Sequence, residues 1–179
     1  MTNPVDAALD RLVRDIADFP QAGIVFKDIS PLLADPEGFA TTVAALAERG
    51  RRLVPEGVDA VVGIEARGFI FAAPVALALG AGFVPVRKPG KLPAATHEVS
   101  YALEYGTETL QIHQDALRPG DRVLIVDDVL ATGGTLRATT DLVERCGAHV
   151  SGVAMLLELS FLNARTRLDG LNVDALRVV

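Results

Sequence analysis

The chain has few of the residues that build disulfide frameworks or metal centres. Its 179 residues include one cysteine, Cys146, and no tryptophan, and its three histidines are dispersed without the spacing of metal ligands. A single cysteine excludes an internal disulfide and a thiolate-rich metal site. We interpret Cys146 as a small buried hydrophobic residue, and we expect no metal site made of the protein's own side chains.

Clusters of basic residues are also absent. The formal net charge is −6, and neither lysine nor arginine forms a block. Nucleic-acid binding requires a concentrated positive surface, so we expect no nucleic-acid partner. A small substrate rich in phosphate remains compatible with this composition, because a few local cations are enough to bind it.

Only one stretch, residues 69–86, is uncharged for long enough to be compared with a membrane span. Proline and glycine residues divide it into a buried helix and a short strand; these are Pro74, Gly80, Gly82 and Pro85. The N-terminal residues do not combine a basic start with an apolar run, as a secretion signal does. We therefore expect a cytoplasmic protein with no membrane partner.

Half of the residues are hydrophobic and 22% are charged, which predicts one globular domain over residues 1–179. Apolar runs predict strands at 60–64, 83–86, 123–126 and 150–156, separated by helices at about 68–80 and 134–147. This alternation favours an α/β fold with a parallel sheet and right-handed crossovers.

The N-terminal region is expected to be helical. The spacing of Leu9, Leu12, Val13 and Ile16 predicts an amphipathic helix that ends near residues 19–20. Asp35 and Pro36 resemble the cap and first turn of a second helix, with apolar residues on one face; these are Phe39, Val43 and Leu46.

Residues 87–112 interrupt the alternation of strands and helices. They begin with charges and prolines and then alternate apolar and polar residues, which predicts a loop that leads into an antiparallel excursion from the sheet. A long connection of this kind in a compact domain is usually functional and often acts as a lid.

Residues 123–135 carry the clearest chemical signal, with the sequence Val-Leu-Ile-Val-Asp-Asp-Val-Leu-Ala-Thr-Gly-Gly-Thr. Asp127 and Asp128 follow a strand that is apolar on both faces, and ligands of α/β sheets bind beyond the carboxyl ends of such strands. Adjacent carboxylates repel each other unless a cation or hydroxyl donors share their charge, as a ribose diol can. Residues 131–135 are small, so their backbone N–H groups can close on a phosphate at the start of a helix, where Thr135 can add a hydroxyl. The segment predicts a sugar-phosphate site.

This segment resembles the binding motif for 5-phosphoribosyl 1-pyrophosphate (PRPP) of the type I phosphoribosyltransferases. It is neither a P-loop nor a dinucleotide-binding turn, because it has no Gly-Lys-Ser/Thr and no Gly-x-Gly-x-x-Gly after a strand. The resemblance implies a Rossmann-like core with a parallel sheet, a small N-terminal hood and a flexible catalytic loop. It also assigns a set of residues to PRPP and AMP, namely Asp127, Asp128, Ala131, Thr132, Gly133, Gly134 and Thr135.

A second apolar strand ends in the turn Glu-Ala-Arg-Gly, residues 65–68. Arg67 at a helix N-terminus could supply a bidentate cation to a pyrophosphate, or it could be a surface arginine paired with Glu65. In the family that the chain resembles, this turn lines the pyrophosphate site. The resemblance therefore assigns Arg67 to PRPP and to pyrophosphate.

A basic loop follows the strand predicted at 83–86. Arg87, Lys88 and Lys91 lie within five residues, and such a run is either a solvated loop or a mobile set of cations for phosphates. In the resembling family the loop closes over pyrophosphate, which assigns these three residues to that group.

Residues 101–106, Tyr-Ala-Leu-Glu-Tyr-Gly, resemble the adenine phosphoribosyltransferases in particular. Bond formation at a purine nitrogen releases a proton, which a carboxylate within hydrogen-bonding reach can accept. The resemblance gives this catalytic role to Glu104 and a pyrophosphate contact to Tyr105. From the pattern alone, Glu104 could also be an outward-facing residue of an exposed strand.

Residues 19–30 resemble the adenine-binding hood of the same family, formed by about residues 1–35. Val25 and Lys27 can offer backbone acceptor and donor groups to adenine, and Phe26 can stack on the ring. Many relatives have arginine at the position of Lys27. The change is harmless if only the backbone is used, but lysine lacks the planar fork of arginine if the side chain grips a phosphate.

The resemblance implies that the chain transfers the 5-phosphoribosyl group of PRPP to adenine and gives AMP and pyrophosphate. It also implies Mg²⁺ carried by PRPP and a homodimer. Other classes stay open: a 6-oxopurine or orotate transferase, against which the Leu-Glu-Tyr-Gly string argues, and a purine-sensing regulator that binds PRPP without catalysis. A PRPP synthetase is disfavoured because no ATP site is evident.

Overall fold

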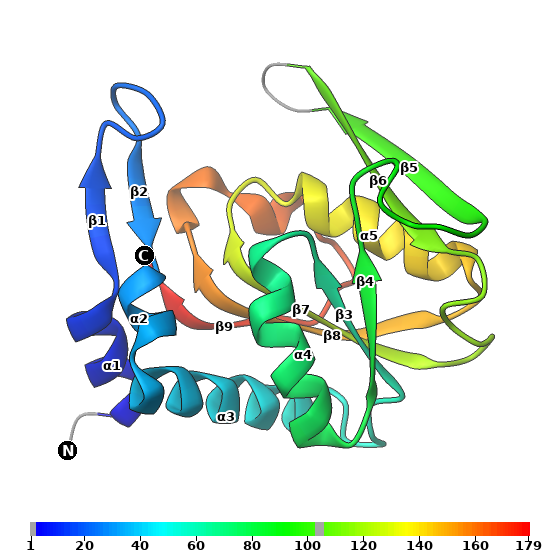
Figure 1. Ribbon diagram of the computed structural model, residues 1–179, viewed down its shortest axis with the longest axis horizontal. Helices are drawn as coiled ribbons and strands as arrows, with labels where there is room; N and C mark the ends of the chain where they lie inside the picture. The colour runs from blue at the N-terminus through cyan, green and yellow to red at the C-terminus, as the bar shows by residue number, and fades with distance from the viewer. Residues whose placement is uncertain (1–2, 103–105) are drawn as a thin grey trace. The chain divides into compact units, whose positions relative to one another are not determined.

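The computed structural model describes residues 3–102 and 106–179. The chain divides into two compact units, one that reaches to Ala45 and one that runs from Leu46 to Val179. Figure 1 shows the helices and strands of both.

The first unit contains two short helices, a hairpin and the start of a long helix. Its elements are α1 (Pro4–Leu12), β1 (Arg14–Ala17), β2 (Val25–Asp28), α2 (Ser30–Ala34) and the beginning of α3 (Pro36–Leu53). The predicted start of α3 is confirmed. The carboxylate of Asp35 accepts a hydrogen bond of 2.7 Å from the N–H of Gly38, as an N-terminal cap does.

The predicted N-terminal helix is wrong beyond Leu12. Val13 adopts an extended conformation, and residues 14–17 pair with β2 in an antiparallel ladder. Helical spacing placed Ile16 on the buried face, yet its side chain is 38% exposed. Pairing with β2 and the ion pair of Arg14 with Asp28 at 2.5 Å outweigh the local helical pattern.

The second unit is built on a five-stranded parallel sheet in the order β4-β3-β7-β8-β9. The strands are β3 (Ala60–Ile64), β4 (Gly82–Val86), β7 (Arg122–Leu130), β8 (His149–Glu158) and β9 (Val173–Val178). The predicted α/β class and the four predicted strands are confirmed, and β9 was not predicted. None of the helices in residues 3–102 and 106–179 has the length and apolar character needed to cross a bilayer.

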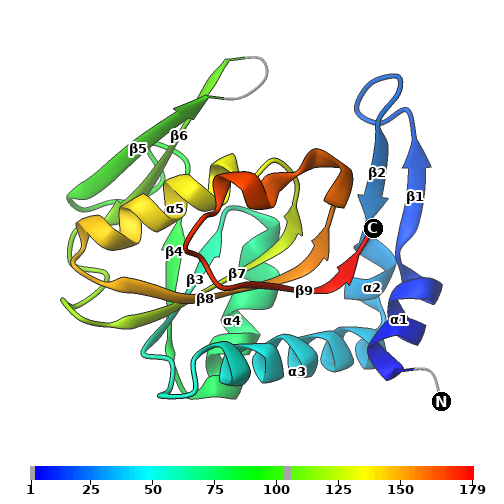
Figure 2. The same ribbon diagram turned by 180° about the vertical axis from the view of Figure 1, so that it is seen from behind.

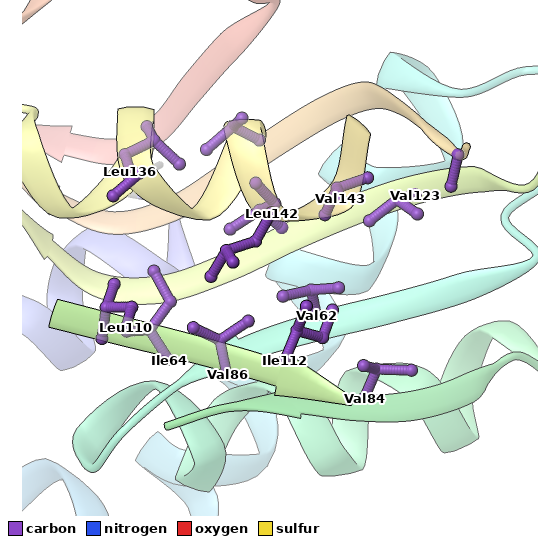
Figure 3. Packing of buried hydrophobic residues seen from close by; sticks show 14 of the residues in the cluster. Val62, Ile64, Val84, Val86, Leu110, Ile112, Val123, Leu136, Leu142 and Val143 are labelled. Carbon is purple, nitrogen blue, oxygen red and sulfur yellow. The ribbon is translucent and has the colours of Figure 1, made fainter. Parts of the chain in front are cut away.

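Two helices cover opposite faces of this sheet, α4 (Arg67–Leu79) and α5 (Gly134–Arg145) (Figures 1 and 2). Side chains of successive strand residues point to alternate faces. Val62 and Ile64 of β3 therefore point to the α5 side, where they belong to one buried cluster with Leu142 and Val143 of α5 (Figure 3). The short 3₁₀ helices η1 (Ser160–Leu162) and η2 (Ala164–Arg167) connect β8 to β9.

The predicted antiparallel excursion is confirmed as the hairpin of β5 (Thr96–Ala102) and β6 (Thr107–His113). Its apolar face is part of the core, because Val99, Leu110 and Ile112 are buried in the cluster that α5 covers. Leu110 and Ile112 can be seen there in Figure 3. The hairpin is thus fixed to α5 by packing, and its register places Tyr101 opposite Glu108.

The close contact between β3 and α4 depends on a glycine. A Cβ atom on Gly63 would lie 2.6 Å from the Cβ of Ala72 and 2.9 Å from Cε2 of Phe83. We expect Gly63→Ala to lower the free energy of unfolding by about 1–3 kcal/mol through overpacking. Gly82→Ala, whose Cβ would meet no described heavy atom within 4 Å, is the matched control. Urea unfolding of both variants measures the difference, and equal stabilities would contradict the packing argument.

Candidate active site

The two acidic residues of the main motif lie where the pairing of β7 becomes one-sided. Pairing with β3 ends at Val126, whereas pairing with β8 continues to Leu130. The predicted end of the strand at Val126 is therefore wrong, because β8 extends β7 through Asp127 and Asp128. On the β3 side, the backbone beyond Val126 is released from the ladder. Asp127 lines a pocket together with Met155 of β8 and residues that follow β7.

Asp127 and Asp128 differ in what compensates their charge. Asp128 is 5% exposed, and its Oδ2 lies 2.7 Å from Nε of Arg67. The two groups are close but not aligned as a hydrogen bond, and among the described residues the buried Oδ2 of Asp128 has no hydrogen-bond donor. Burial, followed by the negative charge of Asp128, raises the pKa of Asp127 well above its usual range. Asp127 Oδ1 accepts a hydrogen bond of 2.9 Å from the N–H of Asp128.

Gly68 allows α4 to approach Asp127. A Cβ atom at this position would lie 2.5 Å from Oδ1 of Asp127. A side chain at position 68 would therefore collide with Asp127. Because Gly68 has none, the start of α4 can lie next to the carboxylate.

The small residues after β7 form the wall of the pocket. Gly133 has a positive φ of 83° and precedes α5, a conformation that favours glycine. A space of about 410 Å³, part of which is open solvent, is lined by Asp127, Val129, Leu130, Ala131, Thr132, Gly133, Thr135, Leu136 and Met155. We call residues 131–135 the phosphate turn. The structure thus brings one predicted carboxylate, Asp127, together with most of this turn at the N-terminus of a helix, where anions bind.

Arg67 is the first residue of α4, and its ion-pair partner is Asp128. The alternative pairing with Glu65 is not the one observed. Glu65 Oε2 accepts hydrogen bonds from the N–H of Lys88 at 3.0 Å and from Nε of Arg87 at 3.2 Å. The Lys88 N–H and then Arg87 lower the pKa of Glu65. The Glu65–Ala66 peptide bond, which precedes Arg67, is cis.

The basic loop is attached to the hairpin through a second carboxylate. Nζ of Lys88 lies 2.5 Å from Oε1 of Glu108, and the hydroxyl of Tyr101 donates to Oε2 of Glu108 at 2.7 Å. The contact with Lys88, and then that with Tyr101, lowers the pKa of Glu108. Arg87 donates to the backbone carbonyl of Lys91 at 3.2 Å, so the loop also contacts itself.

Sequence reasoning considered Glu65 only as a partner of Arg67, and it missed the pairing of Glu65 with Arg87 and of Glu108 with Lys88. Glu108 could have been found from its position opposite Tyr101, but that position is known only once the register of the two strands is known. The signal for Glu65 was its place between a strand and Arg67, but the path that returns Arg87 and Lys88 to it is a property of the fold.

The predicted base-binding residues lie on β2 of the first unit. Val25 is half exposed, and the rings of Phe26 and Phe19 meet edge to face with centroids 5.1 Å apart. The Lys27 ammonium lies 2.7 Å from Oδ1 of Asp15 on the neighbouring strand. The other two predicted site residues, Glu104 and Tyr105, lie outside the described residues.

Comparison with known proteins reveals a common family. A model of the phosphoribosyl transferase domain matches residues 32–168. The chain is 63% identical over 169 residues to an adenine phosphoribosyltransferase of Nocardioides sp., covering 94% of this chain and 91% of that protein. A protein of the same name from Thermobifida fusca is 58% identical over the full length of both chains.

Solved structures agree in fold. The crystal structure of adenine phosphoribosyltransferase from Thermoanaerobacter pseudethanolicus superposes with a TM-score of 0.91 at 47% identity, covering 98% of this chain and 99% of the other. The enzyme of Saccharomyces cerevisiae, in complex with an imino-altritol bisphosphate and adenine, gives a TM-score of 0.91 at 38% identity, covering 96% and 97%.

The raised pKa of Asp127 predicts that its negative charge lowers the stability of the folded chain. In the unfolded chain the carboxyl ionises at its usual pKa, but in the folded chain it ionises only at higher pH, so ionisation lowers stability. We expect Asp127→Asn to raise the thermal unfolding temperature at pH 8 and to lose this advantage as the pH falls toward 4. Asp115→Asn, at an exposed position, is the control. An equal effect of both variants at pH 8 would contradict the assignment.

Proposed function

The chain belongs to the phosphoribosyltransferase family and, within it, to the adenine phosphoribosyltransferases, and we propose that it transfers the 5-phosphoribosyl group of PRPP to adenine, giving AMP and pyrophosphate. It is then a pentosyltransferase of purine salvage. The observation that supports this best is the pocket that joins the carboxylate of Asp127 to the small-residue turn at the start of α5.

The ribose of PRPP fits the chemistry of this pocket. Its hydroxyl groups donate hydrogen bonds, and Asp127 is a partly buried carboxylate whose pKa is raised by burial and by the charge of Asp128. Ribose hydroxyls bound to Asp127 and Asp128 would stabilise both carboxylates. The ionised pair would in turn lie close to the positive charge that develops on the ribose as pyrophosphate leaves. The 5-phosphate would accept hydrogen bonds from the backbone N–H groups of residues 131–135 and from Thr135.

The leaving pyrophosphate would be bound by Arg67, Arg87, Lys88 and Lys91, with Tyr105 as a further contact. Mg²⁺ would enter as part of the substrate, bound to PRPP oxygens and water, and would offset the charge of the leaving group. Mg²⁺ commonly keeps several waters and binds through one or two carboxylates plus substrate phosphates. Among the described residues no group of three or more acidic, histidine or cysteine side chains could hold a metal.

Adenine would bind to the edge of β2. Val25 and Lys27 are two residues apart on a strand, so their backbone N–H and C=O groups point to the same edge. In the described part of the chain, the sheet of β2 contains only β1 as a second strand, which leaves one edge of β2 without a partner strand. Phe26 would stack on the ring, and Glu104 would accept the proton that leaves the purine nitrogen.

We further propose that the chain acts in the cytoplasm as a homodimer and as one functional domain. In this domain residues 1–35 form the base-binding hood and residues 87–112 include the loop that closes over pyrophosphate. The outer face of α4 supports a dimer, because Leu77 is 83% exposed and Ile70, seven residues earlier, is 39% exposed on the same side of the helix.

The activity is tested by incubating the purified chain with Mg²⁺, PRPP and one base at a time: adenine, hypoxanthine, guanine or orotate. We expect AMP from adenine and no nucleotide from the other bases. Glu104→Gln should lower kcat by about 100-fold or more, because general-base catalysis is removed. Glu144→Gln, on an exposed part of α5, is the control.

Turnover of another base would move the chain to a neighbouring subfamily. Measurable binding of PRPP without turnover of any base would favour the purine-sensing regulator. Normal turnover by Glu104→Gln would leave the transfer reaction standing and remove the role proposed for Glu104.

The ion pair of Lys27 with Asp15 predicts that adenine binding uses the backbone at this position and not the side chain. We expect Lys27→Ala to change the KM for adenine by less than about twofold, because surface ion pairs contribute little. Phe26→Ala should raise this KM by about tenfold, since stacking of a base on an aromatic ring is worth about 1–3 kcal/mol. A large rise for Lys27→Ala would show that its side chain contacts the substrates.

A further inference from the structure

Tyr101 connects the phosphate turn to the basic loop. Its side chain is partly buried against the core, and its ring lies over the start of α5, where a Cβ on Gly134 would be 3.1 Å from Cδ2. Its hydroxyl lies 2.7 Å from Oε2 of Glu108 and 2.9 Å from Oγ1 of Thr135. Glu108 in turn contacts the ammonium of Lys88 at 2.5 Å.

The direction of these hydrogen bonds follows from the protons available. Contacts with Lys88 and Tyr101 lower the pKa of Glu108, so its carboxylate only accepts. Burial is the largest cause that raises the pKa of Tyr101 to about 12, so the phenol keeps its single proton at neutral pH and donates it to Glu108. In the contact with Tyr101, Thr135 must then be the donor. Its one hydroxyl proton therefore points toward Tyr101.

This arrangement conflicts with the role of Thr135 as a donor to phosphate. A threonine hydroxyl has one proton, and the oxygens of a bound phosphate ester mainly accept hydrogen bonds. Thr135 cannot donate to Tyr101 and to phosphate at the same time. Binding of the ligand therefore breaks the bond from Thr135 to Tyr101, while departure of the ligand allows it to form again.

We propose that Tyr101 is a positioning residue that competes with the 5-phosphate of substrate and product for the hydroxyl proton of Thr135. The inference rests on the proposed function, because that function places the 5-phosphate at residues 131–135. Tyr101 weakens the binding of every ligand with this phosphate and so favours product release. It remains bonded to Glu108 when Thr135 turns away, so the carboxylate that contacts Lys88 keeps a partner with the phosphate bound.

The test compares the wild-type chain with Tyr101→Phe, which retains the ring over Gly134 and removes only the hydroxyl. Isothermal titration with ribose 5-phosphate measures the affinity of the phosphate turn without turnover. Tyr101→Phe should bind ribose 5-phosphate about two- to tenfold more tightly, because the free state loses one competing hydrogen bond. The KM for PRPP should fall in the same direction. A hydroxyl with a merely structural role would give weaker binding when removed.

Two further variants isolate the contact. Ser100→Ala removes a hydroxyl contact on the same hairpin, that of Ser100 with Thr109 at 2.8 Å, and should leave the affinity unchanged. In a Thr135→Val background, the added Tyr101→Phe change should have no effect, because the proton for which Tyr101 competes is gone. Thermal unfolding of each variant checks that the fold is retained.

Unchanged or weaker binding of ribose 5-phosphate by folded Tyr101→Phe would overturn the inference. Tighter binding that persists in the Thr135→Val background would also overturn it, since Tyr101 would then act through another group. If the wild-type chain forms AMP but Tyr101→Phe binds no more tightly, only this inference fails. If the wild-type chain neither binds ribose 5-phosphate nor forms AMP, the proposed function fails, and this inference fails with it.

Discussion

The poorly solvated charge of Asp127, next to that of Asp128, is the main constraint on the structure around the end of β7. Burial and the neighbouring Asp128 raise its pKa, and the opposing influence of Arg67 is smaller than either. Arg67 is placed against Asp128 instead, at 2.7 Å. The start of α4 can approach only because Gly68 has no side chain, and the pairing of β3 with β7 ends at Val126. These features leave the carboxylate of Asp127 able to accept hydrogen bonds from ligand hydroxyl groups. An otherwise apolar sheet thereby has a polar site at the carboxyl end of β7.

The cations assigned to pyrophosphate are arranged on a different principle, because three of them already have carboxylate partners. Arg67 pairs with Asp128, Arg87 with Glu65 and Lys88 with Glu108. Lys88 is the most exposed of the three cations, and an ion pair at such a position contributes only about 0–1 kcal/mol, so it orients the side chain without binding it tightly. A pyrophosphate, with its higher charge, can then attract cations that are already close. In the proposed function, the same carboxylates would compete for these cations and so favour the departure of a highly charged product.

The elements predicted correctly are those that local sequence determines. Apolar runs identified four strands of the main sheet, and the Asp-Pro pair identified the start of α3. Strand β9 was missed although its first residues alternate, with Val173 and Ala175 buried and Asp174 between them less so. Three features that were not predicted depend on neighbouring strands. These are the continuation of β7 to Leu130, the strand at residues 14–17 in place of the predicted helix, and the partners of Arg87 and Lys88. Such pairings join residues far apart in the sequence, which periodicity cannot detect.

Helix α5 explains how distant parts of the second unit act on one pocket. Its N-terminus carries Thr135, and its buried face packs beneath the hairpin of β5 and β6, which holds Tyr101. Near its other end, Arg145 donates to the backbone carbonyl of Glu98 on β5 at 2.5 Å. Because protein interiors are close-packed, a shift of the hairpin cannot occur without a shift of this helix. The distance between the hydroxyls of Tyr101 and Thr135 therefore depends on the apolar packing around Val99 and Leu142. Val99 and Leu142 do not line the pocket, so they can affect it only through the positions of the elements that carry them.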